Sequence, residues 1–256
     1  MLDAKTLTVF VTGATAGFGA ATAKRFAQAG AKVVISGRRA DRLDALKAEL
    51  GGGDRVHAFT LDVRDSQAVQ AAVDGLPAGF AEIDVLVNNA GLALGIGPAQ
   101  TADLADWETM VDTNIKGLMY CTRAILPGMI QRDRGHIINL GSMAGTYPYP
   151  GGNVYGATKA FVKQFSLNLR ADVLGARVRV TNLEPGMAES EFSEVRFKGD
   201  KAKAKDLYKG VQPMTPADIA ETIFFAATLP AHVNLNRIEM MPVMQAFAPL
   251  AVKREG

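Results

Sequence analysis

The sequence predicts an α/β fold: a single doubly wound parallel sheet with helices on both faces. Short runs rich in β-branched residues alternate with longer helical patterns along the chain. Such alternation is typical of right-handed crossovers between parallel strands. The strand cores VFVTG, VVIS, VLVNN and HIINL are apolar throughout instead of alternating. This pattern is expected when both faces of a sheet are buried.

The elements follow one another in a regular order. Strands are predicted at residues 6–11, 32–36, 56–61, 85–88, 136–140, 178–183 and 237–241. Helices are predicted at residues 19–29, 41–50, 66–75, 106–132, 155–174 and 219–228. We expect Pro127 to bend or divide the long fourth helix. No repeat or linker interrupts the pattern, so one domain over residues 1–256 is expected, with an insertion over the site at about 184–216.

Composition argues against several classes of function. The net charge is only +2 and the basic residues are spread along the chain, so no nucleic-acid surface is expected. Cys121 is the single cysteine and lies in an apolar stretch, which predicts a buried core residue. His57, His136 and His232 follow no metal-ligand spacing, so no metal site is expected. With no signal peptide and no apolar run of about 20 residues, we expect a cytoplasmic protein without a membrane span.

A glycine-rich turn joins the first predicted strand to the first helix. Residues 12–19 read TGATAGFG, at the point where a dinucleotide pyrophosphate rests on a helix N-terminus. Glycine permits the turn and a close approach of the backbone to phosphate. A tight turn without a ligand is the alternative. The loop residues expected to contact a dinucleotide are Gly13, Thr15, Gly17, Phe18 and Gly19.

The end of the second strand predicts which dinucleotide binds. An NAD-binding fold usually has an acid there, against the ribose 2′-hydroxyl. This chain has Ser36-Gly37-Arg38-Arg39 instead. Two guanidinium groups suit a 2′-phosphate, which favours NADP over NAD. The alternative is a pair of solvated arginines, although positive charge at a helix start is unfavourable without a ligand.

Three motifs in the right order resemble the short-chain dehydrogenase/reductase family. They are the TGxxxGxG spacing, the NNAG run at 88–91, and Tyr155-Gly-Ala-Thr-Lys159. The resemblance covers nearly the whole chain and implies a Rossmann-type fold. It also implies a homotetramer in which the helices at 106–132 and 155–174 pack across subunits. Further cofactor contacts implied by the family pattern are Asp62, Val63, Asn89, Ala90, Gly91, Tyr155, Lys159, Pro185 and Gly186.

The predicted catalytic residues are Asn114, Ser142, Tyr155 and Lys159. Tyr155 and Lys159 share a helix face, and Ser142 follows a strand. A free tyrosine has a pKa near 10, and a nearby ammonium lowers the pKa, which makes Tyr155 a candidate general acid/base. Ser142 would orient the substrate oxygen. Family resemblance implies that Asn114 anchors a water extending a proton relay from Lys159; a helix asparagine bonded to backbone is the alternative.

Within the family, the chain resembles a bacterial branch that acts on 3-hydroxy acids such as serine and 3-hydroxypropionate. Sulfoacetaldehyde reductase, with a sulfonate in place of the carboxylate, is the alternative. Both substrates are small anions, and Arg196 is the expected partner because guanidinium suits an oxyanion; a surface arginine is the other interpretation. The residues expected to line the substrate pocket are Ser142, Tyr147, Tyr149, Asn153 and Arg196.

Two other classes of function remain open at this level. A non-catalytic NADP-binding regulator has no need for the four catalytic residues together, and a structural protein has no need to bind NADPH. The lysine-rich stretch 198–209 predicts a solvated helix, with a charged lid as the alternative. The tail at 246–252 is apolar enough to contact a neighbouring subunit.

Overall fold

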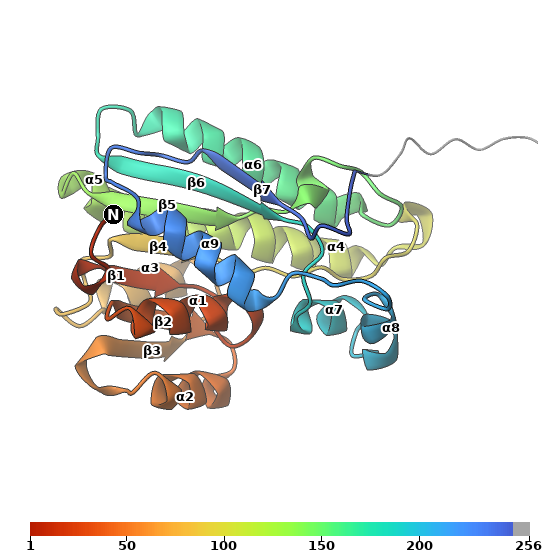
Figure 1. Ribbon diagram of the computed structural model, residues 1–256, viewed down its shortest axis with the longest axis horizontal. Helices are drawn as coiled ribbons and strands as arrows, with labels where there is room; N and C mark the ends of the chain where they lie inside the picture. The colour runs from red at the N-terminus through yellow and green to blue at the C-terminus, as the bar shows by residue number, and fades with distance from the viewer. Residues whose placement is uncertain (248–256) are drawn as a thin grey trace, which may run out of the picture.

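One parallel sheet runs through the centre of the molecule (Figure 1). The computed structural model describes residues 1–247. Its strand order is β3-β2-β1-β4-β5-β6-β7, and every pairing is parallel. The order reverses between β1 and β4, which creates a topological switch point at the carboxyl ends of these strands. The strands are β1 (Thr8–Val11), β2 (Lys32–Gly37), β3 (Val56–Thr60), β4 (Val85–Asn88), β5 (Gly135–Leu140), β6 (Val178–Pro185) and β7 (Arg237–Met240).

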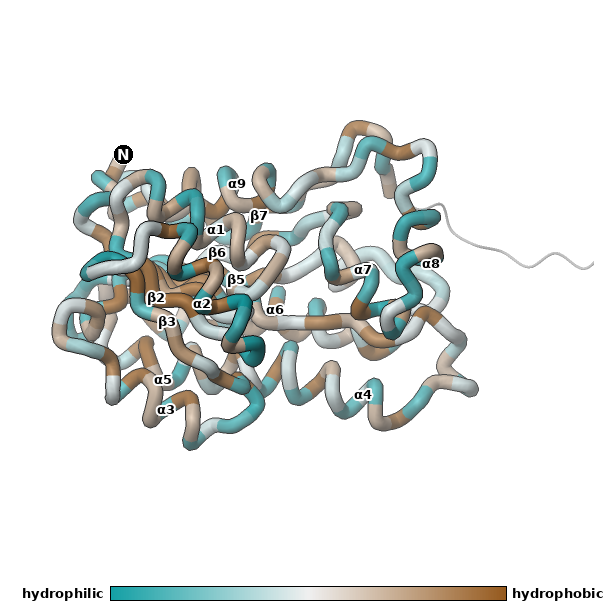
Figure 2. The backbone as a smooth tube through the Cα atoms, turned by 90° about the horizontal axis from the view of Figure 1, so that it is seen from below, coloured by the Kyte–Doolittle hydropathy of each residue, from teal (hydrophilic) through white to brown (hydrophobic). Residues whose placement is uncertain are grey.

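Helices cover both faces of the sheet, as predicted. One face packs against α1 (Gly17–Gln28), α2 (Ala40–Glu49) and α9 (Pro216–Thr228). The other packs against α3 (Ser66–Asp74), α5 (Leu118–Gln131) and α6 (Asn153–Asp172). Figure 2 shows the hydrophobic strands enclosed between these helices. The doubly wound α/β fold is therefore confirmed.

The region expected as an insertion contains two short helices. These are α7 (Glu191–Arg196) and α8 (Lys201–Asp206). Glu184 and Pro185, the first residues of the expected insertion, are instead the last residues of β6. The lysines of α8 are exposed to solvent, as expected for a solvated helix.

The long helical region is divided, but not at Pro127. It consists of α4 (Leu104–Val111), a π-helical turn at Asp112–Gly117, and α5. The α5 helix continues through Pro127, so the expected division there is wrong. Pro127 has no N–H to donate to the carbonyl of Arg123, so one helical hydrogen bond is missing. Both residues are exposed, and water can replace this bond. The irregular turn instead carries Asn114 into the interior.

Cys121 belongs to the core on the α5 side of the sheet, as predicted. Burial raises the pKa of its thiol to about 12. His136 is also buried, and its Nε2 atom lies 2.8 Å from the Thr181 hydroxyl. Across residues 1–247, His, Cys, Asp and Glu form no group of three that would hold a metal. No helix in the same range is long and apolar enough to cross a bilayer. The predicted tail contact at 246–252 falls mainly outside the described residues.

Gly145 should be required where the short turn Met143–Gly145 meets α6. A Cβ atom on Gly145 would lie 2.6 Å from the carbonyl carbon of Lys159, which is backbone and cannot move aside. We expect Gly145→Ala to cost about 1–3 kcal/mol of unfolding free energy and to lower Tm by several degrees. Gly79→Ala is the matched control, because its Cβ would have only an ordinary contact at 3.8 Å. Thermal denaturation measures both, and equal Tm values would contradict the close-packing argument.

Candidate active site

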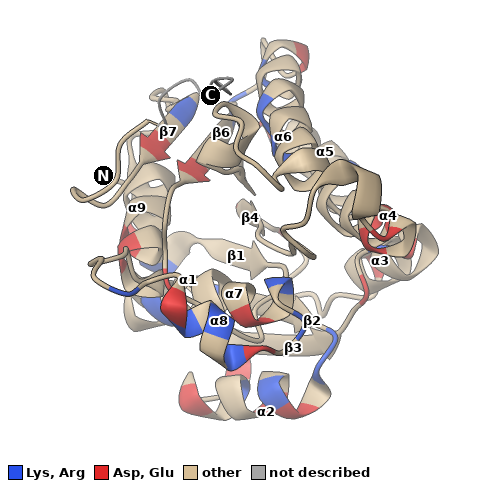
Figure 3. Ribbon diagram, turned by 90° about the vertical axis from the view of Figure 1, so that its right-hand side faces the viewer, with Lys and Arg blue, Asp and Glu red and all other residues tan. Residues whose placement is uncertain are grey.

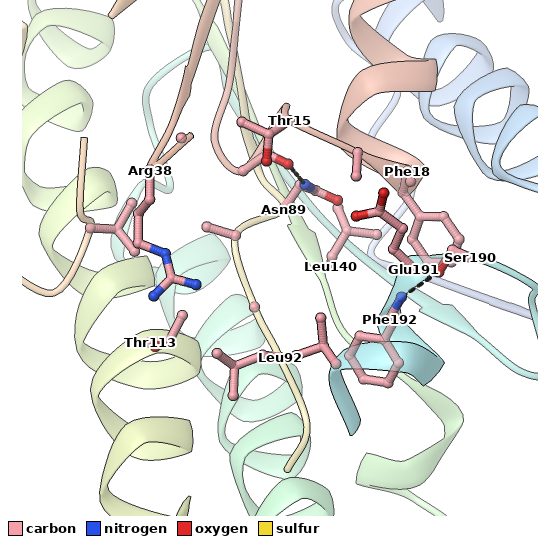
Figure 4. Close-up of a pocket in the computed structure, with 18 of the residues that line it drawn as sticks. Thr15, Phe18, Arg38, Asn89, Leu92, Thr113, Leu140, Ser190, Glu191 and Phe192 are labelled. Atoms are coloured by element: carbon pink, nitrogen blue, oxygen red, sulfur yellow. Dashed lines mark hydrogen bonds between the residues drawn. The ribbon is translucent and has the colours of Figure 1, made fainter. Parts of the chain in front are cut away.

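A cavity of about 300 Å³ lies at the carboxyl edge of the sheet. This size is in the range of small-molecule sites. The cavity is lined by residues of the predicted glycine loop and of the NNAG run, and by Tyr155 and Lys159. Figure 4 shows how side chains from the β1, β4 and β5 loops and from α7 meet there. The predicted residues that line it are Gly13, Thr15, Gly17, Phe18, Arg38, Arg39, Asp62, Val63, Asn89, Ala90, Gly91, Tyr155 and Lys159.

The glycine loop is held against β4 by Asn89. The Asn89 Nδ2 atom donates to the carbonyl oxygens of Thr12 and Gly13, at 2.9 and 3.0 Å. A Cβ on Gly13 would lie 2.8 Å from the Cα of Ala90, and a Cβ on Gly19 would lie 2.5 Å from Asn89 Nδ2. Gly13 also has a φ of +66°. These glycines let the loop lie close to its neighbours and leave backbone facing the cavity, which fits a pyrophosphate.

The two predicted 2′-phosphate arginines have different environments. Arg39 donates to Thr15 Oγ1 from Nε at 3.2 Å and from Nη2 at 2.8 Å. Its Nη1 atom lies 3.2 Å from the Glu191 carboxylate, which also pairs with Arg42. Arg38 also lines the cavity; in Figure 4 its guanidinium lies toward Thr113, away from Glu191. No carboxylate follows β2 directly, so the site fits a 2′-phosphate better than a free 2′-hydroxyl.

Asp62 lies in the cavity wall but is paired within its own loop. Both carboxylate oxygens accept from Arg64 Nε, at 2.9 and 3.0 Å. The hydrogen bonds from Arg64 lower the pKa of Asp62. Val63 packs against the π-helical turn, where a Cβ on Gly117 would lie 2.5 Å from Val63 Cγ2. The loop after β3 is thus braced by its own arginine and by that turn.

Tyr155 and Lys159 face the same buried region from α6. Burial raises the pKa of Tyr155 to about 12, although a hydrogen bond with Ser142 lowers it. Lys159 Nζ donates to the Leu140 carbonyl at 2.7 Å and lies 5.8 Å from the centre of the Tyr155 ring. Burial lowers the pKa of Lys159 to about 8. The prediction of a lowered pKa for Tyr155 is therefore wrong for the protein alone, because burial raises this pKa.

Asn114 is bonded to backbone, as the alternative interpretation described. Its Nδ2 atom donates to the Leu92 carbonyl at 2.8 Å and to Thr158 Oγ1 at 3.1 Å. Its Oδ1 atom accepts from the Leu92 amide at 2.8 Å. The side chain therefore uses both of its N–H groups within the protein. It ties the π-helical turn to the segment after β4 and to α6.

The four predicted substrate residues near α6 and α7 divide into two pairs. Arg196 Nη2 donates to the Tyr149 hydroxyl at 2.7 Å, and the guanidinium carbon lies 5.7 Å from the centre of the Tyr155 ring. Tyr147 instead donates to Glu239 on β7 at 3.1 Å. Asn153 donates to the Gly97 carbonyl at 3.2 Å. The structure thus brings Arg196 and Tyr149 to the tyrosine, while the polar atoms of Tyr147 and Asn153 are bound elsewhere.

Ser142 and the β6 end complete this part of the site. Ser142 Oγ accepts from the Ala144 amide at 3.1 Å and donates to the Pro185 carbonyl at 3.4 Å. Gly186 is bonded through its amide to Met240 of β7 at 2.7 Å. The serine hydroxyl thus links the carboxyl ends of β5 and β6 beside Tyr155.

Comparison with known proteins agrees with this geometry. The family model described as short chain dehydrogenase matches residues 7–201. The chain belongs to this family. NADP-dependent 3-hydroxy acid dehydrogenase of Salmonella typhi is 60% identical over 96% of this chain and 99% of its own length. Sulfoacetaldehyde reductase 2 of Chromohalobacter salexigens is 56% identical over 96% of this chain and 98% of its own.

A solved structure is similar to this short-chain dehydrogenase over almost its whole length. The closed form of serine dehydrogenase complexed with NADP+ matches with a TM-score of 0.95 and 58% identity, covering 96% of this chain and 99% of that one. The curated relatives and this neighbour include NADP-dependent enzymes, and the neighbour holds NADP+.

Sequence reasoning missed several cavity residues of this short-chain dehydrogenase, among them three from α7: Glu191, Phe192 and Val195. The Phe192 ring lies 5.6 Å from the Tyr155 ring. The N-cap Ser190 before two acidic residues signals the start of this helix, but no periodicity shows which residues face inward. Their place depends on how the segment folds back over the sheet.

The buried lysine predicts a pH dependence of stability. The pKa of Lys159 is about 8 in the folded protein and near 10.4 in an unfolded chain. Between these values the unfolded chain binds more protons, so Lys159 makes stability rise with pH. We expect the difference in Tm, native protein minus Lys159→Met, to increase from pH 7.5 to pH 10. Parallel thermal denaturation of both proteins over this range is the measurement, and a constant difference would contradict the lowered pKa.

Proposed function

We propose that this protein is an NADP(H)-dependent oxidoreductase that interconverts a short anionic alcohol and its carbonyl form, most simply a 3-hydroxy acid and its semialdehyde. The observation that carries this proposal is the guanidinium of Arg196, 5.7 Å from the ring of the buried Tyr155. A candidate acid/base and a candidate anion partner thus lie next to each other. Relatives named for 3-hydroxy acids and serine support this substrate class.

The residues of the cavity fit NADP. The glycine loop would hold the pyrophosphate, Arg38 and Arg39 the 2′-phosphate, and Asp62 and Val63 the adenine side. The NNAG run, Pro185 and Gly186 would support the nicotinamide half. When bound, the cofactor supplies or accepts the hydride. Lys159 would hold the nicotinamide ribose from α6.

Tyr155 is suited to move the proton. With a pKa of about 12 its phenol is neutral at physiological pH and can donate a proton to the substrate oxygen during reduction. Ser142 would hydrogen-bond the same oxygen and orient it. In the oxidation direction Tyr155 takes the proton back, which requires positive charge nearby to stabilise the phenolate. Lys159 and Arg196 are the cations at hand, and Asn114 would support the relay by holding the π-helical turn against α6.

Arg196 would anchor the acid group of the substrate. Its contact with the Tyr149 hydroxyl and a second contact with the Gly95 carbonyl at 3.4 Å hold the guanidinium toward Tyr155. A planar guanidinium can donate hydrogen bonds to a carboxylate or to a sulfonate. Sulfoacetaldehyde is therefore the second candidate substrate, which the relatedness to sulfoacetaldehyde reductase 2 favours.

We also propose a cytoplasmic homotetramer. Phe161 and Phe165 are partly exposed and stack on α6 with ring centres 5.6 Å apart, while Met119 on α5 and Leu167 on α6 are exposed. Leu118, Ile125 and Leu169 are buried in the core instead. These exposed and partly exposed side chains are the apolar surface that we propose for contact with a second copy. Light scattering of the purified protein measures the mass of the assembly.

A substrate panel tests the proposed activity and its anion anchor. Nicotinamide absorbance is followed with NADP+ and serine, allo-threonine, 3-hydroxypropionate or isethionate, and with NADPH and malonic semialdehyde or sulfoacetaldehyde. We expect the 3-hydroxy acids and malonic semialdehyde to be preferred. Arg196→Gln should raise KM about ten-fold or more, the loss of a charged hydrogen bond. Lys198→Gln removes a charge from the same segment and should change KM little. No change in nicotinamide absorbance with any compound of the panel would contradict the proposed substrate class.

Tyr155→Phe separates catalysis from binding. The variant keeps the ring and its contacts but lacks the proton donor, so turnover should fall by about 10²-fold or more. NADPH affinity, measured by titration, should stay within a few fold of the native value. Substantial remaining turnover would contradict the assigned role and favour another proton donor.

A further inference from the structure

Arg39 of the predicted 2′-phosphate site and its neighbour Arg42 share a carboxylate from α7. Glu191 is the first residue of α7, and its two oxygens pair with Arg39 and Arg42. Arg42 is one turn into α2, behind Arg39. In Figure 3, α7 and α8 lie in front of β2, and the two salt bridges join the start of α7 to Arg39 and Arg42. Two salt bridges thus join the start of α7 to the start of α2.

The N–H groups of Arg39 are largely used inside the protein. Nε and Nη2 donate to Thr15, and Nη1 faces Glu191. A phosphate binds guanidinium best through two parallel N–H bonds. The bonds to Thr15 and Glu191 use three of the five guanidinium N–H groups. A 2′-phosphate that binds through Nη1 shares that nitrogen with Glu191, whose negative charge repels the phosphate.

The same short helix also contacts the catalytic tyrosine. The ring of Phe192, the residue after Glu191, lies 5.6 Å from the Tyr155 ring, and Arg196 at the end of the helix lies 5.7 Å from it. The segment also touches the phosphate loop, since a Cβ on Gly17 would lie 3.5 Å from Ser190 Cβ. One rigid element of six residues therefore joins the 2′-phosphate arginines to the substrate anchor.

We propose that Glu191 is a specificity-determining residue that competes with the 2′-phosphate of the cofactor for Arg39 and latches α7 over the site. The proposal rests on the proposed NADP dependence. The latch holds Arg196 and Phe192 beside Tyr155, and its charge lowers the affinity of the arginines for phosphate. Cofactors without a 2′-phosphate do not meet this competition. Glu191 thus reduces the preference for NADP while it orders the substrate end of the helix.

Calorimetric titration of the full-length protein tests the competition without relying on turnover. The ligands are NADP+, NAD+, adenosine 2′,5′-bisphosphate and adenosine 5′-monophosphate. Glu191→Gln should tighten NADP+ and the bisphosphate about two- to five-fold, the range of an exposed ion pair. The two ligands without a 2′-phosphate should change less than two-fold. Glu194→Gln removes the same charge one turn later on α7 and should leave all four affinities unchanged.

A second variant tests the route of the effect. In Arg42→Gln, Glu191 pairs with Arg39 alone. This substitution should therefore weaken NADP+ binding more in the native protein than in a protein that already carries Glu191→Gln. Amide hydrogen exchange of residues 190–196 in the cofactor-free protein should be faster in Glu191→Gln than in Glu194→Gln. The first result supports competition at Arg39, and the second supports the latch.

The outcomes separate this inference from the proposed function. If the native protein does not bind NADP+ more tightly than NAD+, the proposed cofactor is wrong. If it does, but Glu191→Gln leaves NADP+ affinity unchanged or weaker, the competition is overturned. Equal tightening of NADP+ and NAD+ also overturns it, because the effect would not depend on the 2′-phosphate. Unchanged exchange at 190–196 overturns the latch.

Discussion

Burial of both faces of the sheet is the constraint on which the rest of the molecule depends. The strands are apolar because each face meets a layer of helices, and this leaves the carboxyl edge as the place where chain turns can present polar groups. The glycine loop, Ser142 and the segment after β4 all lie at this edge. The site is therefore a consequence of strand direction as much as of the individual side chains.

Desolvation determines the charges within that edge. Tyr155 is held as a neutral phenol, and Lys159 has a pKa of about 8, both because they are buried. Together these effects make the protein alone a better proton donor than acceptor. The same burial strengthens the electrostatic interactions that these two side chains make with one another and with their neighbours.

Much of the fold could be predicted from the sequence, because apolar strand cores and glycines at turns are local signals. The glycine loop, the NNAG run, Tyr155 and Lys159 were all brought to one cavity for the same reason: each is positioned by an adjacent strand or helix. The π-helical turn was not predicted, since its cause is tertiary: Asn114 bonds to Leu92 and Thr158. Glu191 was missed because its partners lie about 150 residues earlier in the chain.

The strand order has a consequence for synthesis of the protein. The strand β1 pairs with β2 on one side and with β4 on the other. A chain emerging from the ribosome therefore has one edge of β1 without its partner until residue 88 has been made, with the glycine loop beside it. An open edge of this kind is prone to pair with other chains. The core of the first half is thus incomplete until β4 has been made, and the nascent chain is exposed to aggregation through this edge in that interval.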